Sequence, residues 1–347
     1  MGDSSQLIED SSGKNEKSLG HSGKCQHNFL DVKDRRILEE LDLDARQSNS
    51  SIAKKTKLSK EVVNYRVKNL IKKKIVNGFY SVIDVAKLGY TLYRLFFKFV
   101  DVDPEKEKEI MQFLKEQKKV TWVITLEGVH DLAVLICAKD VFKFKEVLDD
   151  LMGEYGKYLD LREITLVLKI HHFKHKYIYG AKDFTTAMIG GSIDDRQLDE
   201  VDTSILQILS KEARLPILNI AKQLKLSPNT VKYRIKNLLK SGVLVSFRPD
   251  INISKLGYQH YKVFLFMNKI DKQSKSRLTE FLKTKLPVIY VTEAIGGSDL
   301  EFEAHVKSSL ELNQIIKEMR YTFPGLVSDY ETTIVNKSMI LAYIPVC

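Results

Sequence analysis

The chain is poor in cysteine, and this shortage excludes two classes of small domain. Its three cysteines, Cys25, Cys137 and Cys347, are too few and too far apart for a disulfide framework or a zinc site. Proteins with so little cysteine have no need of an oxidising compartment, so we expect this one in a reduced cytoplasm.

Long apolar runs are also missing. No stretch approaches the roughly 20 apolar residues that cross a bilayer, and the N-terminus has no apolar core of a signal peptide. Residues 1–29 are rich in serine, glycine and charged side chains, with almost no bulky apolar ones, so we expect a disordered tail there. We therefore expect no membrane partner.

Positive charge, by contrast, is abundant. The 347 residues include 55 lysines and arginines against 45 acidic residues, a net charge of +10. Such an excess favours an anionic partner, although it says nothing about the fold. The hydrophobic content of 44% is ordinary for a soluble protein, and the length allows two to four domains.

Residues 198–250 carry the most informative pattern. A short helix is predicted at Ile217–Lys222 and a second at Ser227–Lys240, where the Ser227 hydroxyl can cap the helix and Gly242 can end it. Four apolar side chains recur at the spacing of one buried stripe: Val231, Ile235, Leu238 and Leu239. A short helix, a tight turn, a capped basic helix and a following strand indicate a winged helix-turn-helix, which usually binds DNA.

The pattern occurs twice. Shifted along itself until Leu30 falls on Leu198, the sequence aligns without a gap as far as Phe79 and Phe247. The same shift superposes Ala45-Arg46 on Ala213-Arg214, Tyr65-Arg66 on Tyr233-Arg234, and Leu88-Gly89-Tyr90 on Leu256-Gly257-Tyr258. So long a period indicates two copies of a two-part unit and not a solenoid. The first copy of the winged helix-turn-helix is predicted at residues 30–82.

The first copy departs from the second at the end of its third helix. Lys74 stands where the second copy has Gly242, so we expect the helix to end differently, at a cost of about 1 kcal/mol. Its predicted buried positions are Val63, Val67, Leu70 and Ile71.

A second domain follows each copy, at residues 90–172 and 258–347. The first has strand-like stretches at 91–100, 120–126, 132–137 and 164–170, with helical stretches at 104–116 and 141–151. The second repeats this order at 261–266, 275–284, 288–294, 300–305, 310–319 and 332–340. The order βαββαβ is that of the ferredoxin-like fold. The predicted class is α+β, with two winged helix-turn-helix and two ferredoxin-like domains in tandem.

Residues 173–197 are predicted to link the two halves. His171, His172 and His175 suggest a metal site, but no carboxylate or cysteine accompanies them locally, so we favour a basic, aromatic connector without a metal. Gly190-Gly191-Ser192 is its expected flexible part.

Several short motifs carry a resemblance to a known family. They are Leu30-Asp31 with Asp34, Ile37-Leu38, Ala45-Arg46, Ile52-Ala53, Leu58-Ser59 and, in the second copy, Leu226-Ser227-Pro228. Together with the domain order, they resemble the Lrp/AsnC (feast/famine) transcriptional regulators in a tandem-duplicated, archaeal form. The resemblance implies a DNA-binding protein and not an enzyme, without a cofactor. It also implies that the ferredoxin-like (RAM-type) domains mediate dimerisation, giving a homo-oligomer or an intrachain pseudo-dimer, and bind an amino acid or similar effector.

In helix-turn-helix proteins the N-terminal part of the last helix contacts bases, while flanking groups hold phosphate. The predicted base contacts are Lys60, Glu61 and Asn64 in the first copy, with Asn229 and Lys232 in the second. The predicted phosphate contacts are Arg66, Lys68, Arg234 and Lys236. The full candidate surface adds Ser59, Tyr65, Lys72, Ser227, Thr230, Tyr233 and Lys240. The alternative for the lysines is a solvated helix face, and for the two tyrosines we favour packing beneath the helix.

The resemblance also indicates where an effector would bind, because the family has a Gly-x-x-Asp turn between the second and third strands of this domain. The matching residues are Gly128, His130 and Asp131 in the first half, and Gly296, Gly297, Ser298 and Asp299 in the second. Glycine lets the backbone approach a ligand, and aspartate can accept from an ammonium group. The alternative is an ordinary hairpin turn. Since the two turns differ, either they bind different molecules or only one binds.

A second family resembles the same double scaffold, the siroheme decarboxylases, and is the alternative function. No convergent cluster of histidine and arginine is repeated in the predicted strands, so we favour the regulator. We expect the two sheets to pair face to face through Leu95, Phe97, Val123 and Leu135 with their second-copy equivalents. The two third helices would then enter successive major grooves and read non-identical half-sites.

Overall fold

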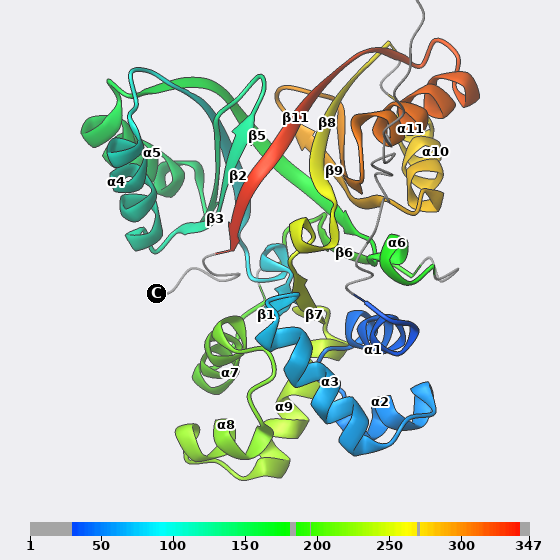
Figure 1. The fold of residues 1–347 in the computed structure, drawn as a ribbon. Coiled ribbons are helices and arrows are strands. Elements are labelled where there is room, and N and C mark those ends of the chain that lie inside the picture. Colours follow the sequence, from blue (N-terminus) through cyan, green and yellow to red (C-terminus); the bar gives the residue numbers. More distant parts are fainter. Residues whose placement is uncertain (1–29, 181–184, 195, 269–270, 341–347) are drawn as a thin grey trace, which may run out of the picture.

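The computed structural model describes residues 30–180, 185–194, 196–268 and 271–340, arranged in two tiers (Figure 1). The helix-turn-helix units form one tier and the two sheet domains form the other. The predicted disordered tail, residues 1–29, lies outside the described residues. Within the described ranges, no helix is both long and apolar enough to cross a membrane.

The first DNA-binding unit consists of α1 (Val32–Leu43), α2 (Asn49–Thr56), α3 (Lys60–Lys72) and β1 (Val76–Ile83). The second consists of α7 (Glu200–Lys211), α8 (Ile217–Leu224), α9 (Pro228–Lys240) and β7 (Leu244–Ile251). The predicted cap is confirmed, because the hydroxyl of Ser227 accepts from the amide of Thr230 at 3.0 Å. Ser59, the equivalent residue of the first unit, caps α3 in the same way by accepting from the amide of Val62 at 3.2 Å.

The wings of the two units are joined to each other. β1 runs antiparallel to β7, from Val76 opposite Ile251 to Ile83 opposite Leu244. A lone strand leaves its backbone amides and carbonyls without partners, and here each wing satisfies those of the other. The two-stranded ribbon therefore ties the two DNA-binding units together.

The first sheet domain contains η1 (Val85–Lys87), β2 (Thr91–Phe99), α4 (Pro104–Glu116), β3 (Val120–Glu127), β4 (Leu132–Ala138), α5 (Val141–Tyr155) and β5 (Leu159–His172). The second contains η2 (Ser254–Leu256), β8 (Gln259–Met267), α10 (Lys272–Thr284), β9 (Val288–Ile295), β10 (Leu300–Val306), α11 (Ser309–Thr322) and β11 (Val327–Ile340). After the short η helices, both follow the predicted βαββαβ order.

The last strand of each half is long enough to belong to both sheets. The first part of β5 pairs with β2 of its own half, and the second part pairs with β9 of the other half. β11 pairs in the same way with β8 and then with β3. These two crossings close the strands into one ring, in the order β2-β4-β3-β11-β8-β10-β9-β5, and are visible where β5 and β11 cross (Figure 1).

Two sets of apolar side chains pack against this ring. Leu95, Phe97 and Val123 face the helices of their own half, where they are fully buried beside α4 and α5. The surface between the two half-sheets is formed by the alternate positions, including Phe96 and Phe264. The predicted inter-sheet contact through Leu95, Phe97 and Val123 is therefore wrong. The two faces of β2 in fact differ, since the face towards the helices is apolar and the face between the half-sheets carries Arg94 and Lys98 beside Leu92 and Phe96.

The described parts of the segment between the halves are docked on two different parts of the molecule. α6 (Lys176–Tyr179) packs on the first DNA-binding unit, where Ile178 is buried with Leu38 and Leu70. β6 (Ala187–Gly190) adds to the edge of β5 in the sheet. The amide of Gly190 also donates to Asp84 at 2.9 Å. The expected flexible element at Gly190 is therefore part of a sheet, because its backbone groups have partners in β5 and in the loop before η1.

Lys74 ends its helix as Gly242 does. Its φ is +56°, close to the +75° of Gly242, so a lysine adopts the left-handed conformation that glycine adopts in the other copy. The prediction of a different helix end is wrong. The conformation is imposed by Ile75, which is buried and whose amide donates to Leu70 at 3.0 Å.

Candidate nucleic-acid interface

α3 and α9 expose the lysine and amide side chains that the sequence pattern selected. In α3 the exposed candidates are Lys60, Glu61, Asn64, Tyr65, Lys68 and Lys72. In α9 they are Asn229, Lys232, Tyr233, Lys236 and Lys240, while Thr230 is half-buried beside the capping Ser227. Ile71 and Leu239 are 37% and 41% exposed, so their predicted burial is wrong. Each lies at the margin of its helix's apolar stripe, next to the lysine face.

The two tyrosines do not pack beneath their helices. Tyr65 is 70% exposed and Tyr233 is 63% exposed, at equivalent positions of the two copies. The expectation of packing is therefore wrong for both. Since the two rings lie on the same exposed faces as the lysines, they belong to the candidate interface.

The two arginines next to them are oriented by carboxylates and not left free for phosphate. Arg66 contacts Asp31 at 2.7 Å and Asp34 at 2.8 Å, at the start of α1. Arg234 pairs in the same way with the equivalent Asp199 and Asp202 at the start of α7. Each pair fixes the recognition helix to the first helix of its own unit. The structure therefore gives Arg66 and Arg234 a positioning role where the sequence predicted phosphate binding.

A reciprocal pair of arginines joins the two units close to these helices. Arg46 donates to the carbonyls of Ala213 and Leu215 at 2.5 and 3.0 Å, and its guanidinium lies 5.3 Å from the Phe247 ring. Arg214, its equivalent, donates to the carbonyl of Gln47 at 3.5 Å and lies 4.8 Å from the ring of Phe79. We call this the arginine clasp. Burial lowers the pKa of both guanidinium groups. The repeated arginines and phenylalanines were visible in the sequence, but their crossing from one unit to the other was not.

Each Gly-x-x-Asp turn lies against the last strand of the opposite half. A Cβ on Gly128 would lie 3.0 Å from the hydroxyl of Thr333 in β11, and one on Gly296 would lie 2.6 Å from the carbonyl of Ile164 in β5. The aspartates are occupied by their own halves. Asp131 accepts from the Lys98 ammonium at 2.8 Å and the Phe99 amide at 2.9 Å.

The second turn has the same anchor, since Asp299 accepts from the Met267 amide at 2.7 Å. The predicted role of these aspartates as ammonium acceptors is not supported by this geometry. A different carboxylate lies at the second turn. A Cβ on Gly297 would lie 1.5 Å from the Glu163 carboxylate, whose pKa is raised by burial and by the charge of Glu301.

The other residues of the two turns also differ in surroundings. His130 packs between Phe96 and Phe264, with ring centroids 4.5 and 5.7 Å away. Burial, together with the charges of Lys98 and Arg94, lowers its pKa to about 4. Ser298, its equivalent, is buried 3.5 Å from Glu301. The first turn therefore places a neutral imidazole in an aromatic setting, and the second places a hydroxyl among charges.

A chain of buried ion pairs runs between the two half-sheets. Arg94 of β2 pairs with Glu301 of β10, and Lys262 of β8 lies 2.6 Å from Glu301 and 3.0 Å from Glu303. His260 continues the chain to Glu303 at 2.8 Å. Burial opposes ionisation of Glu303, but Lys262 and His260 outweigh it and hold its pKa well below the usual range. These charges compensate one another inside the ring.

Next to this chain, histidines gather where the first DNA-binding unit meets the second sheet domain. The His305 ring lies 4.6 Å from that of His260 and 5.8 Å from that of His175, and Tyr177 bonds to it at 2.6 Å. His175 in turn bonds to the buried Asp42 of α1, which also pairs with Arg248 of β7.

The sequence predicted no histidine–arginine cluster repeated in the two halves, and the single cluster in the structure agrees with that prediction. Its members come from α1, β7, β8 and β10, and from the segment that follows β5, so no local spacing connects them. The cluster is not repeated, because Leu92 and Cys137 stand at the positions of His260 and His305. Among the described residues, no group of three or more histidine, cysteine or acidic side chains is placed to hold a metal ion.

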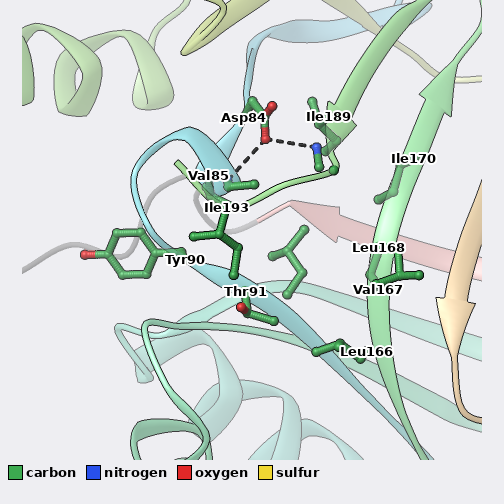
Figure 2. Close-up of a pocket in the computed structure, with 14 residues that line it drawn as sticks. Asp84, Val85, Tyr90, Thr91, Leu166, Val167, Leu168, Ile170, Ile189 and Ile193 are labelled. Carbon is green, nitrogen blue, oxygen red and sulfur yellow. Dashed lines mark hydrogen bonds between the residues drawn. The ribbon is translucent and has the colours of Figure 1, made fainter. Parts of the chain in front are cut away.

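An apolar cavity of about 80 Å³ lies at the junction of η1, β2, β5 and β6 (Figure 2). Its walls are mainly aliphatic, with Leu92, Val167 and Ile189 among them. Asp84 at its edge accepts from the Ala86 and Gly190 amides at 3.1 and 2.9 Å. Burial raises the pKa of this carboxyl. The cavity has the size and polarity for a small aliphatic group, and it borders the segment that joins the two halves.

Comparison with known proteins identifies the family. A model of the winged helix-turn-helix DNA-binding family matches residues 30–77 and 198–245. The chain is 35% identical over 126 residues to the HTH-type transcriptional regulator LrpA of Pyrococcus horikoshii, spanning 36% of this chain and 88% of LrpA. This chain belongs to the Lrp/AsnC family of transcriptional regulators. The regulator FL11 of Pyrococcus furiosus is 32% identical over 121 residues, or 34% of this chain and 78% of FL11.

These alignments cover about a third of this Lrp/AsnC chain, a length that fits one of its two halves. The tandem arrangement as a whole is similar to a solved structure, the siroheme decarboxylase NirDL. The TM-score is 0.59, over 89% of this chain and 92% of NirDL, with 15% sequence identity. At that identity the likeness shows the fold alone. The named regulators therefore support a DNA-binding, non-enzymatic Lrp/AsnC protein.

Proposed function

We propose that this protein is a sequence-specific DNA-binding transcription regulator that reads two unlike half-sites of one operator. The observation that carries the proposal is the pair of capped helices, α3 and α9, whose lysine faces are exposed while the arginine clasp holds their units together. The lysine and amide side chains of each helix would contact DNA, with Tyr65 and Tyr233 beside them.

The half-sites are unlike because the two helices begin differently. Lys60 and Glu61 open α3, whereas Pro228 and Asn229 open α9. Residues in the first turn of a recognition helix contact base edges, so they decide which bases are preferred. We therefore expect an imperfect palindrome. Selection of bound fragments from genomic DNA, followed by footprinting, tests this expectation, and a perfectly symmetric operator would contradict it.

Base contact and phosphate contact can be separated by substitution. Asn229→Ala should relax the preference at one base pair of the second half-site by about 1–3 kcal/mol, because a bidentate amide–adenine contact is lost. Preferences in the first half-site should stay as in the wild type. Equal loss of affinity for every sequence would place Asn229 on the phosphate backbone instead.

We also propose that an amino acid or similar small molecule modulates DNA binding from the second turn. The support is the Glu163 carboxylate, which lies against Gly297 and can accept from an ammonium group, whereas Asp299 is oriented by the Met267 amide of its own half. A thermal-shift screen with the twenty amino acids should find a stabilising ligand whose effect is lost in Glu163→Gln. A ligand whose effect persists in that variant would place the effector elsewhere.

The two halves of one chain would then correspond to the two subunits of a family dimer. The support is the crossing of β5 and β11, which joins the half-sheets as two separate subunits would be joined. The siroheme decarboxylase alternative shares this scaffold. Absorbance after addition of an iron-containing tetrapyrrole separates the two functions, since a specific spectral complex without DNA binding would favour the enzyme.

A further inference from the structure

One of the candidate base contacts is held by a second amide and, through it, by the other DNA-binding unit. Asn64 of α3 accepts at its Oδ1 from the Nδ2 of Asn49, the first residue of α2, at 3.0 Å. The Oδ1 of Asn49 accepts from the guanidinium of Arg214 at 3.2 Å. Arg214 belongs to the second unit, so the contact crosses the arginine clasp.

Chemistry sets the direction of both amides. A guanidinium can only donate hydrogen bonds, so the side of Asn49 that faces Arg214 must be its carbonyl oxygen. The amino group of Asn49 must then face Asn64, and the carbonyl oxygen of Asn64 must accept its hydrogen bond. The amino group of Asn64 is therefore left on the outer arm of its carboxamide, on the exposed face of α3.

The second unit has no equivalent of this relay. Ile217 stands at the position of Asn49, and Lys232 stands at that of Asn64. Arg46, the equivalent of Arg214, donates to the backbone carbonyls of Ala213 and Leu215. The clasp is reciprocal, but only Arg214 reaches a side chain that contacts a recognition helix.

We propose that Asn49 and Arg214 are positioning residues that make Asn64 a hydrogen-bond donor to DNA, so that the second unit sets a base preference of the first. This inference rests on the proposed function, since it concerns how α3 reads its half-site. The outward amino group donates to guanine O6 or N7, adenine N7 or thymine O4. Cytosine offers only a donor in the major groove, so the base facing Asn64 should be anything but cytosine.

Asn49→Asp reverses the relay without removing it. A carboxylate at this position accepts from Arg214 and also from the Asn64 amino group, which turns the Asn64 oxygen outward. The acceptor then favours cytosine N4 or adenine N6. Binding selection from a randomised first half-site should show guanine or thymine over cytosine by about tenfold for the wild type. The variant should show cytosine over guanine and thymine by a similar factor.

Three further variants test the cause, and two of them are matched controls. Ser50→Asp adds the same charge one residue away and should keep the wild-type preference, which separates the relay from repulsion of phosphate. Arg214→Met should lose the discrimination against cytosine, whereas Arg46→Met breaks the other arm of the clasp and should keep it. Enrichment of the second half-site in the same selection shows that each variant is folded.

The outcomes separate this inference from the proposed function. If the wild type enriches no half-site at all, sequence-specific regulation fails, and the relay fails with it. If the wild type discriminates but Asn49→Asp and Arg214→Met retain its preference at that base, the relay alone is overturned.

Discussion

Lysines hold the left-handed backbone positions that end helices in both DNA-binding units. Lys57 and Lys225 have φ values of 56° and 53° in the turns of the two motifs, and Lys74 has 56° at the end of α3. Side chains other than glycine are strained in this region, by about 1 kcal/mol or more. The strain is tolerated because the residue that follows Lys74, Ile75, is anchored in the core.

We expect Lys74→Gly to stabilise the protein by about 0.5–1 kcal/mol, because the strain is relieved and the lysine side chain is exposed. Denaturant unfolding measures the change. Lys73→Gly is the matched control. Because Lys73 has a φ of −74°, glycine at this position relieves no strain and should destabilise the protein. A loss of stability in Lys74→Gly would show that Lys74 makes a contact that outweighs the strain.

His172 is the residue whose burial predicts a dependence of stability on pH. Neither ring nitrogen has a hydrogen-bond partner among the described residues, and the ring packs edge-on against Tyr290 at 4.8 Å. Burial lowers its pKa to about 3, helped by Arg248. The folded state therefore disfavours the protonated ring, and the unfolded state takes up the proton near pH 6.5.

Stability should accordingly be complete above pH 6.5 and decrease as the pH falls towards 3, by roughly 2–3 kcal/mol at pH 4.5. His172→Phe keeps the ring and should remove this contribution, so the profile becomes shallower while the part due to His130 remains. Unfolding midpoints from pH 7 to 4 make the test, and equal slopes in the wild type and His172→Phe would contradict it.

At the scale of the element, the arginine and the lysines of each recognition helix have different roles. Arg66 and Arg234 lock α3 and α9 to α1 and α7 through carboxylates. Lys68 and Lys236 remain exposed and carry no ion pair among the described contacts. The lysines are thus the groups available for phosphate, and the arginines set the angle at which they are presented.

We expect Lys68→Ala and Lys236→Ala to weaken binding to all DNA sequences alike. Each loss of a phosphate contact should reduce the slope of log affinity against log salt concentration by about 0.9. Fluorescence anisotropy across a salt series measures the slope. Lys108→Ala, in α4 of the sheet domain, is the control. A change in base preference, with the salt slope unchanged, would assign these lysines to bases instead.

At the scale of the whole molecule, the halves are interleaved. The ribbon of β1 and β7, the crossings of β5 and β11, and the arginine clasp each join residues of one half to residues of the other. The single tryptophan, Trp122, lies at one crossing, where its indole donates to the hydroxyl of Ser338 in β11 at 2.6 Å.

We expect the tryptophan fluorescence and the far-ultraviolet circular dichroism to report one shared unfolding transition, because neither half can lose its sheet without breaking the other. Two separate transitions would show that the halves unfold independently. The same interleaving gives α3 and α9 a set spacing, which is what an operator of two half-sites requires.

Local pattern was enough to predict most of the elements. The repeat, the capping serines, the bounds of α4 and the βαββαβ order follow from periodicity, end signals and turn residues, which act within a few positions of the chain. Burial within one helix was also predictable from spacing, except at the margins of the stripe, at Ile71 and Leu239. The sequence by itself therefore determined the fold class, the two DNA-binding units and the basic faces of their helices.

The tertiary structure alone decided which strands, arginines and histidines of one half contact residues of the other half. Backbone hydrogen bonds are alike for every strand, so no local pattern shows that β5 continues into the other sheet or that β1 pairs with β7. The same holds for the Asn64–Asn49–Arg214 relay and the histidines around His305, whose members lie far apart in the chain. Their chemistry depends on proximity, and only the folded chain brings them together.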